Sequence, residues 1–275
     1  MVDALNYIPA GLAPAGTHLP VAVADALASM ARLRAVSVTP ERHWLLQRVD
    51  RKYALPRANL PLLINALADN HEVLTAAGEY AASYVTVYYD TDERRFLRDH
   101  LRGRRPRHKL RVRHYLDRKL SYLEVKTKTA GGRTIKARMP RDFGGNGLAP
   151  DEQRWAAAHT GEHEELRARA WTTCQRISLL RSGVPGRITI DLNVSLGTGG
   201  SARSLRDLVL VEVKQERPQA DPELAQLFLM AEARPVSLSK YVAAMIDADP
   251  ALPRARFLSV LGRYARPEYW QECRS

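Results

Sequence analysis

The chain has 275 residues, with 42 Lys and Arg against 30 Asp and Glu, which gives a formal net charge of +12 at pH 7. This length allows one large domain or two small ones and is ample for burying a core. The excess of positive charge favours anionic partners, among them nucleic acid, phosphorylated small molecules, polyphosphate and an acidic membrane face. Composition alone does not choose among these partners.

The sequence carries no pattern typical of export or of membrane insertion. The first thirty residues lack a basic segment followed by an apolar one, since Lys or Arg first appears at Arg32. No apolar stretch approaches the roughly 20 residues that cross a bilayer. Cys174 and Cys273 lie far apart and predict neither a disulfide framework nor a zinc site. We therefore expect a soluble, cytoplasmic protein.

Helical segments divide the chain into three regions. Residues 1–40 are rich in Ala, Pro and Gly and contain one helical segment at about 21–33, which we interpret as an N-terminal arm or accessory helix. Residues 41–250 are expected to form the main domain, and residues 251–275 a C-terminal helical tail. The spacing of apolar residues predicts further helices over 59–70, 91–101, 151–181, 223–233, 238–246 and 254–264.

Strands dominate the main domain. Gly131 and Gly132 predict a hairpin turn between two of them. The fold class is therefore α+β, an antiparallel sheet with flanking helices. About eight strands closed into a barrel would enclose a lumen for one elongated ligand, and we expect such a closed tunnel. Alternating, β-branched and aromatic residues predict strands over 42–53, 80–90, 110–115, 122–129, 134–139, 187–194 and 208–215.

Charged side chains recur at every second position of these strands. Arg111 and Arg113 alternate with apolar residues, so both lie on one face of a strand, about 6.6–6.8 Å apart. Two guanidinium groups at this spacing suit neighbouring phosphoryl groups, because their planar donors bind phosphate oxygens in pairs. The alternative is a solvated face of an edge strand, whose charge prevents aggregation. Repeated on several strands, the pattern favours a barrel that holds a polyanion.

Two strands share the pattern Glu-x-Lys, at Glu124 and Lys126 and again at Glu212 and Lys214. A carboxylate beside a lysine suits a divalent cation together with a phosphate, because Mg²⁺ and Mn²⁺ use one or two carboxylates and complete their shell with phosphate oxygens and water. The alternative is an ordinary salt-bridged pair on the surface.

Lys52, Lys136 and Lys240 complete the basic set. Lys240 follows Ser239 near the predicted start of a helix, where free amides and a hydroxyl favour phosphate binding. The alternative for Lys240 is an exposed helix residue without a ligand.

Taken together, these segments resemble the VTC (vacuolar transporter chaperone) domain, the polyphosphate-polymerase branch of the triphosphate tunnel metalloenzymes, a CYTH-like superfamily. The phosphate-sensing and membrane regions of the eukaryotic members do not occur in the sequence, which resembles a free-standing bacterial-type domain. The runs that carry the resemblance stand in the family's order: Arg51-Lys52-Tyr53, Tyr88-Tyr89-Asp90-Thr91, Arg107–Tyr115, Leu123–Lys128, Ile135–Arg138, Arg187–Asp191, Val211–Lys214 and Leu238–Tyr241.

The resemblance implies a tunnel that takes ATP, a divalent metal (Mn²⁺ or Mg²⁺) and a polyphosphate chain that grows from the γ-phosphate. Glu212 matches the family's metal-binding glutamate, and the Glu-x-Lys pattern adds Glu124 as a second expected metal ligand. Asp50 stands where the family usually has a glutamate, and Cys174 where an aromatic residue is expected. The implied catalytic residues are Lys52, Arg111, Arg113, Lys126 and Lys136. The expected phosphate-binding residues are Arg98, Arg102, Lys109, Arg138, Arg176, Arg187, Lys214, Ser239 and Lys240, of which Arg98 or Arg102, Arg176, Ser239 and Lys240 match the family.

Three functions stay open at this point. The first is a metal-dependent polyphosphate polymerase with ATP, polyphosphate and pyrophosphate as partners. The second is a triphosphatase or nucleotide cyclase, although Arg48-Val49-Asp50-Arg51-Lys52 has few carboxylates for activating water. The third is a non-catalytic binder of polyphosphate or inositol phosphates. Specific nucleic-acid binding is disfavoured, because the strands lack interleaved aromatic platforms for bases. The oligomeric state is not indicated.

Overall fold

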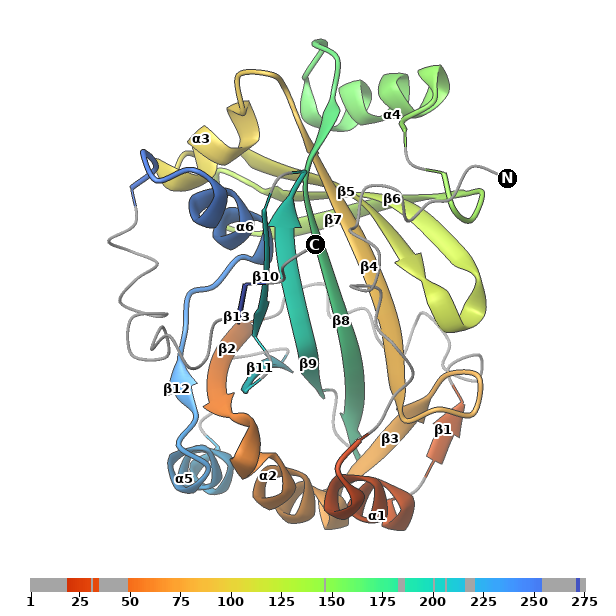
Figure 1. The fold of residues 1–275 in the computed structure, drawn as a ribbon, viewed down its shortest axis with the longest axis vertical. Coiled ribbons are helices and arrows are strands. Elements are labelled where there is room, and N and C mark those ends of the chain that lie inside the picture. The colour runs from red at the N-terminus through yellow and green to blue at the C-terminus, as the bar shows by residue number, and fades with distance from the viewer. Residues whose placement is uncertain are drawn as a thin grey trace.

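The computed structural model describes residues 19–30, 32–34, 49–145, 147–182, 186–199, 201–205, 207–215, 221–253 and 271–272. The predicted helix over 254–264 and residues 42–48 of the first predicted strand lie outside these ranges. The α+β prediction is confirmed, since the strands form one mainly antiparallel sheet with helices packed around it (Figure 1).

Six α-helices are present in the described ranges. None of them is long and apolar enough to cross a membrane. Their bounds are Val21–Ser29 (α1), Leu60–Leu67 (α2), Arg95–Leu101 (α3), Pro150–Thr160 (α4), Pro222–Met230 (α5) and Lys240–Ala248 (α6).

The strands of the main path follow the order β12-β2-β11-β9-β8-β4-β5-β6-β7. Four shorter strands extend it, with β3 beside β8, β1 parallel to β3, and β10 between β9 and β13. The bounds are Arg32–Arg34 (β1), Val49–Pro56 (β2), His71–Thr75 (β3), Ala81–Asp90 (β4), Arg107–Tyr115 (β5), Leu120–Lys128 (β6), Thr134–Arg141 (β7), Arg167–Arg181 (β8), Gly186–Thr198 (β9), Ser201–Leu205 (β10), Leu208–Gln215 (β11), Arg234–Pro235 (β12) and Gln271–Glu272 (β13).

The expected hydrogen-bonded closure of the barrel is not found in the part of the chain that is described. The path ends at β7 on one side and at β12 on the other, and no ladder joins these edges. In Figure 1, β5, β6 and β7 run across the molecule, while β8 and β9 run along it. The sheet therefore turns through a large angle between one limb, β5–β7, and the other limb, β2, β8, β9 and β11. Side chains rather than backbone hydrogen bonds bridge the open side between these limbs.

The prediction of one helix over 151–181 is wrong. Helix α4 ends at Gly161, which has a left-handed backbone with φ of 68°, and residues 167–181 form the strand β8. Strand β8 lies between β4 and β9, and apolar clusters cover both of its faces, so that all six residues from Ala170 to Gln175 are buried. A strand buried on both faces loses the alternation by which strands are recognised.

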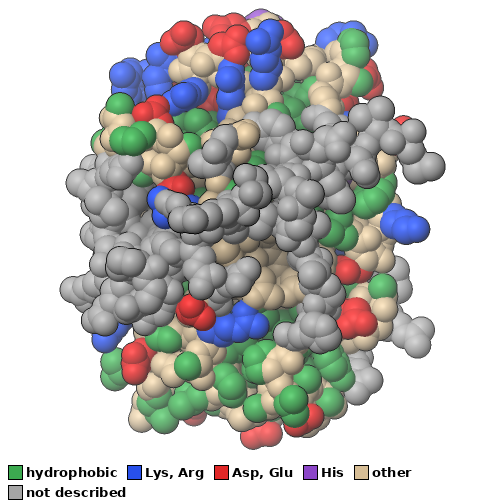
Figure 2. Space-filling model, viewed as in Figure 1, with side chains coloured by type: hydrophobic (Ala, Val, Ile, Leu, Met, Phe, Trp, Pro, Cys, Tyr) green, Lys and Arg blue, Asp and Glu red, His purple; other side chains and the backbone are tan. Residues whose placement is uncertain are grey.

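Three apolar clusters hold the sheet and its helices together. The first joins α1, α2 and α5 to one face of β2, β8, β9 and β11, and hydrophobic side chains gather at this lower end of the molecule in Figure 2. The second packs α6 on the opposite face of the sheet. The third joins the covered face of β4, β5 and β6 to α3 and α4. The charged face of β5–β7 lies opposite this third cluster.

Helix α1 is part of the first cluster, and the burial of its residues predicts different effects on stability for two substitutions. Leu27 is fully buried against this core, whereas Val21 on the same helix is 77% exposed. We expect Leu27→Ala to lower the free energy of unfolding by about 2–5 kcal/mol, through lost burial and a residual cavity. Val21→Ala should change it by less than about 0.5 kcal/mol. Urea denaturation measures both, and equal midpoints for the two variants would contradict the packing of α1.

Candidate functional site

One face of β5, β6 and β7 carries the alternating charges. Leu110, Val112 and Val125 point to the opposite face and are buried in the core. The register places basic residues side by side across the three strands, with Glu124 among them. The rows are Arg111, Glu124 and Arg138, and then Lys109, Lys126 and Lys136.

The other limb of the sheet faces this surface. Lys126 on β6 lies 3.7 Å from Asp50 on β2. Lys109 on β5 donates a hydrogen bond of 2.9 Å to Ser239, at the N-terminus of α6. Since these pairs connect the two ends of the strand order, β5 and β6 lie close to β2 and α6 without a shared ladder.

The residues of both limbs form what we call the basic cluster. Beside its bases stand four carboxylates, Asp50, Glu124, Asp191 and Glu212. Its basic residues come from β2, β5, β6, β7, β8, β11 and α6. They are Lys52, Lys109, Arg111, Arg113, Lys126, Lys136, Arg176, Lys214 and Lys240.

Glu124 is the central carboxylate of β5–β7. Its side chain is 1% exposed and binds Arg111, with Oε2 2.7 Å from Nη2 and 2.8 Å from Nε, while Oε1 lies 2.5 Å from Nζ of Lys136. Burial alone would raise the pKa of Glu124, but Arg111, Arg113 and Lys136 together hold it well below its ordinary value. Both carboxylate oxygens are engaged with cations, which favours a role in orienting Arg111 and Lys136 rather than the expected metal ligation.

Asp191 on β9 plays a comparable part on the opposite limb. It binds Arg176 through two contacts of 2.5 and 2.8 Å and also binds Lys240. Burial would raise the pKa of Asp191, but Arg176 and Lys240 outweigh burial and lower it. The ring of Tyr84 lies under both Arg176 and Arg113, at 5.4 and 5.5 Å from the ring centroid. One carboxylate and one aromatic ring thus fix the guanidinium groups of two strands.

Helix α6 is anchored so that its first turn meets the basic cluster. The hydroxyl of Tyr241 donates a 2.5 Å hydrogen bond to Asp90, which also accepts the backbone N–H groups of Phe96 and Leu97. Lys52 donates a 2.6 Å hydrogen bond to the carbonyl of Leu238 just before the helix. These bonds hold the segment that contains Ser239 and Lys240.

Several lysines of the cluster have pKa values below the ordinary value for lysine. Burial lowers the pKa of Lys136 to about 8 even though Glu124 raises it. Lys214 also falls to about 8, for the same reason and despite its 2.8 Å contact with Glu212. Burial and the neighbouring Lys52, Lys126 and Arg111 also hold the pKa of Lys109 well below its ordinary value. These lysines therefore hold their charge in partly desolvated surroundings, and a bound anion would stabilise the charged form.

Four of the expected phosphate-binding residues lie at the margin of the cluster or outside it. Arg98 is exposed on α3 and lies 3.7 Å from Glu93, and Arg102 is exposed where α3 ends. Arg138 is exposed and covers the ring of Tyr122, 4.8 Å from its centroid. Arg187 stands beside Lys214 in the register of β9 and β11.

Asp191, Tyr84 and Asp90 were not among the site residues expected from the sequence. The contacts of Asp191 and Asp90 join segments far apart in the chain, so no local spacing indicates them. A carboxylate within the apolar run Ile188–Leu192 was the one available signal for Asp191, because a buried charge needs a partner.

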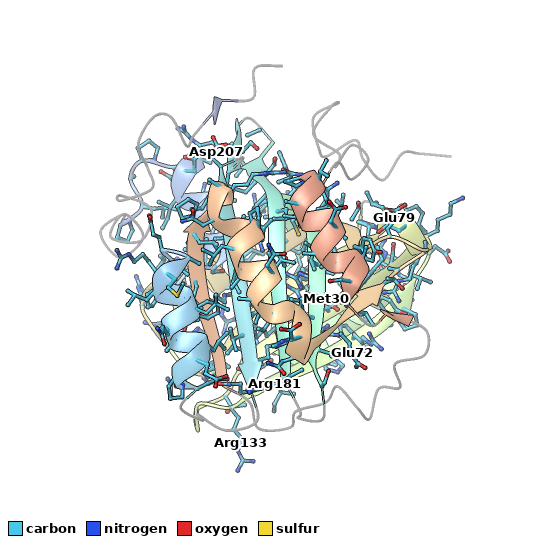
Figure 3. All side chains as sticks on the ribbon, turned by 90° about the horizontal axis from the view of Figure 1, so that it is seen from below. Met30, Glu72, Glu79, Arg133, Arg181 and Asp207 are labelled. Carbon is cyan, nitrogen blue, oxygen red and sulfur yellow. The ribbon has the colours of Figure 1, made fainter. Side chains whose placement is uncertain are left out.

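The described residues also line a pocket between α2 and α5. Leu62, Leu227 and Met230 contribute apolar surface there, with Arg181 at the same pocket. Figure 3 shows Arg181 at the ends of the strands below these helices. This mainly apolar lining does not suit a polyanion, and we place the candidate site at the basic cluster.

The residues present fit a divalent cation at one place. Within the described residues there is no group of three or more His, Cys, Asp or Glu side chains that could hold a metal. However, Glu212 pairs with Lys52 and Asp50 with Lys214 in the same β2–β11 ladder, so the two carboxylates are diagonal neighbours on one face. Lys214 engages only Oε2 of Glu212. Two carboxylates suffice for Mn²⁺ or Mg²⁺ when phosphate oxygens and water complete the shell.

Comparison with known proteins supports the family resemblance. Residues 47–146 match the family model of the VTC domain. This match confirms the resemblance over the segment that carries Lys52, Arg111, Arg113, Lys126 and Lys136. No curated protein matches the chain.

Solved structures give similarities at low identity. A candidate adenylate cyclase from Bacillus halodurans is 11% identical with a TM-score of 0.43, over 72% of this chain and 96% of that one. A candidate adenylyl cyclase from Hippeastrum, described as having a dominant triphosphatase activity, is 14% identical with a TM-score of 0.46, over 76% and 99%. The PH1819 protein from Pyrococcus horikoshii is 9% identical with a TM-score of 0.43, over 73% and 100%.

The contacts of Glu124 predict that its charge stabilises the fold. Glu124→Gln keeps the size of the side chain but leaves Arg111 and Lys136 without their buried counter-charge. We expect the free energy of unfolding to fall by about 3–5 kcal/mol. Glu93→Gln, at a 75% exposed partner of Arg98, should cost less than about 1 kcal/mol. Urea denaturation distinguishes the two, and a wild-type midpoint for Glu124→Gln would disprove the proposed pairing role.

The low pKa values of Lys136 and Lys214 predict a pH dependence of anion binding. Both lysines are charged below pH about 8 and lose their protons as the pH rises through that value. Affinity for tripolyphosphate should therefore fall between about pH 7 and pH 9. Lys136→Arg/Lys214→Arg should show a flatter profile, because arginine keeps its charge. Calorimetric titration at several pH values tests this, and identical profiles for the two proteins would count against it.

Proposed function

We propose that the chain is a metal-dependent polyphosphate polymerase, which transfers the γ-phosphate of ATP to a growing polyphosphate chain held by the basic cluster. The observation that carries the proposal is the convergence of nine basic side chains from both limbs of the sheet. The VTC match over residues 47–146 supports the phosphate chemistry.

The proposed reaction depends on positioning and charge neutralisation, as phosphoryl transfer generally does. Arg111 and Arg113 lie on the same face of β5, two residues apart, and bind adjacent phosphoryl groups. Lys126 and Lys136 continue the row toward the other limb, where Lys52 and Lys240 bind the same chain from the opposite side. The terminal phosphate of the polyphosphate then attacks the γ-phosphorus in line, and ADP leaves.

Glu212 and Asp50 would hold the divalent cation in this scheme. When bound, the cation neutralises charge on the phosphoryl oxygens and aligns them. Lys126 stands close to both carboxylates, since the charges of Glu212 and Asp50 act against the burial that lowers its pKa. This lysine is therefore placed to bind a phosphate oxygen that lies beside the cation.

Polymerisation is favoured over hydrolysis by the pairing of the carboxylates. Glu124 and Asp191 each bind two basic side chains, which lower the pKa values of both carboxyl groups and make them weak bases for activating water. Hydrolysis of a triphosphate needs a base for the attacking water, whereas transfer to a phosphate uses an acceptor that is already ionised. The arrangement therefore suits binding of a polyanion better than activation of water.

Arg113→Ala tests the proposal directly. Each charge-assisted hydrogen bond contributes roughly 1.5–3 kcal/mol, so the variant should make polyphosphate at least about tenfold more slowly. Arg113→Lys should recover part of the rate, because it keeps the charge but not the paired donors. Arg154→Ala, at an exposed position on α4, serves as control and should behave as wild type.

The assay is incubation with ATP and Mn²⁺ followed by detection of acid-labile polyphosphate on a gel. Free phosphate without a polymer would instead identify a triphosphatase. Polyphosphate binding without ATP turnover would identify a binding protein. An unchanged rate in Arg113→Ala would remove this residue from the proposed site.

A further inference from the structure

A second group of basic side chains lies beyond one end of the basic cluster. It surrounds the turn before β5 and the hairpin between β6 and β7. We call it the collar, and it consists of Arg104, Arg105, Arg107, Lys128 and Arg133.

The collar continues the charged face of the sheet. Arg107 precedes Lys109 by two residues on β5, so both side chains point to the same face, about 6.6–6.8 Å apart. Arg107 also pairs with Lys128 in the β5–β6 register. The row of Arg107 and Lys128 therefore follows directly after the row of Lys109 and Lys126, in the direction away from Arg113.

The two loops of the collar lie against each other. The guanidinium of Arg105 approaches the hairpin so closely that a Cβ built on Gly132 would lie 3.2 Å from Nη1. Gly132 has φ of 79°, and the turn is closed by hydrogen bonds of 2.9 Å between Thr129 and both Arg133 and Gly132. Figure 3 shows Arg133 projecting away from the body of the molecule. The collar is thus a defined surface from which Arg133 points outward.

The collar has a large excess of positive charge. Within the described residues, Arg104 is the one member with an ion pair, at 3.5 Å from Asp99. The pKa of Arg107 is lowered by burial and by the nearby Arg105. The pKa of His100 falls to about 3 because of burial and of Lys109, Arg107 and Lys52. Positive charge therefore extends without interruption from the basic cluster to the collar.

Around α3 and α4, by contrast, basic and acidic side chains are mixed, as Figure 2 shows, and the collar begins shortly after α3 ends. Arg95 binds Glu162 there at 2.7 Å, and Arg167 binds Glu165 at 2.8 Å. Several surface arginines outside the collar thus have carboxylate partners. The collar departs from this pattern, and crowded like charges are stabilised when an anion binds between them.

We propose that the collar binds the part of a linear polyphosphate that extends beyond the basic cluster, so that long chains bind more tightly than short ones. This inference rests on the proposed function and adds to it the direction of the bound polyphosphate. The polyphosphate leaves the basic cluster on the side of Arg107 and Lys128. Linear polyphosphate fits because it has one charge per phosphate and no base or acyl group. The segments 102–107 and 128–134 contain no aromatic side chain on which a nucleic-acid base would stack.

The test compares two probes on three proteins. The probes are tripolyphosphate and long-chain polyphosphate, and the proteins are the wild type, Arg105→Glu/Arg133→Glu, and the control Arg154→Glu/Arg234→Glu. The control makes the same change of charge at exposed positions of α4 and β12. We expect the collar variant to lose about tenfold in affinity for long-chain polyphosphate at low salt, with a smaller salt dependence than the wild type. Its affinity for tripolyphosphate should change by no more than about twofold, like that of the control.

Equal losses for both probes, or equal losses in the collar variant and the control, would overturn the inference. A collar variant that loses binding to single-stranded DNA or to phosphatidylserine vesicles, but not to long-chain polyphosphate, would also overturn it and assign the surface to that other polyanion. Failure of the wild type to bind either probe is a separate result, because it contradicts the proposed function itself.

Discussion

The charged face of this sheet depends on carboxylates that each hold two cations. Without Glu124, the half-buried Arg111 and Lys136 would repel each other, and without Asp191 the same would apply to Arg176 and Lys240. These pairings allow many bases to converge in partly desolvated surroundings while keeping their side chains extended and fixed. Burial, together with the neighbouring cations, lowers the pKa values of Lys109, Lys136 and Lys214. Holding these lysines charged in partly desolvated surroundings costs free energy, and a bound polyanion would offset part of that cost.

The apolar cores and helix α6 hold the strands that carry this charged face. Two cores cover one face of the sheet, where α1, α2 and α5 support β2, β9 and β11, and α3 and α4 cover the apolar side of β4–β6. The opposite face is left to charged residues and to α6. Helix α6 is tied by Tyr241 to Asp90, and this contact brings Ser239 next to Lys109. The two limbs meet through such side-chain contacts.

The charged face was predictable where it follows from local alternation. Arg111, Arg113, Lys126 and Lys136 lie on short strands with one apolar face, and a period of two assigns their direction without knowledge of the register. Strand β8 was not predictable in this way, because Trp171 to Gln175 are buried on both sides. The pairing role of Glu124 and Asp191 depends on which strands are neighbours, and a sequence spacing does not contain that information. For the same reason, the Glu-x-Lys pattern predicted a metal ligand at Glu124, whereas in the structure Glu124 binds the side chains of Arg111 and Lys136.

The central claim is that bases from both limbs surround one phosphate-binding path. A crystal structure with tripolyphosphate bound tests it most directly. The account predicts phosphoryl groups between Arg111 and Arg113 on one side and Lys52 and Lys240 on the other. Tripolyphosphate bound only on the outer surface, with these side chains directed away from it, would contradict the account.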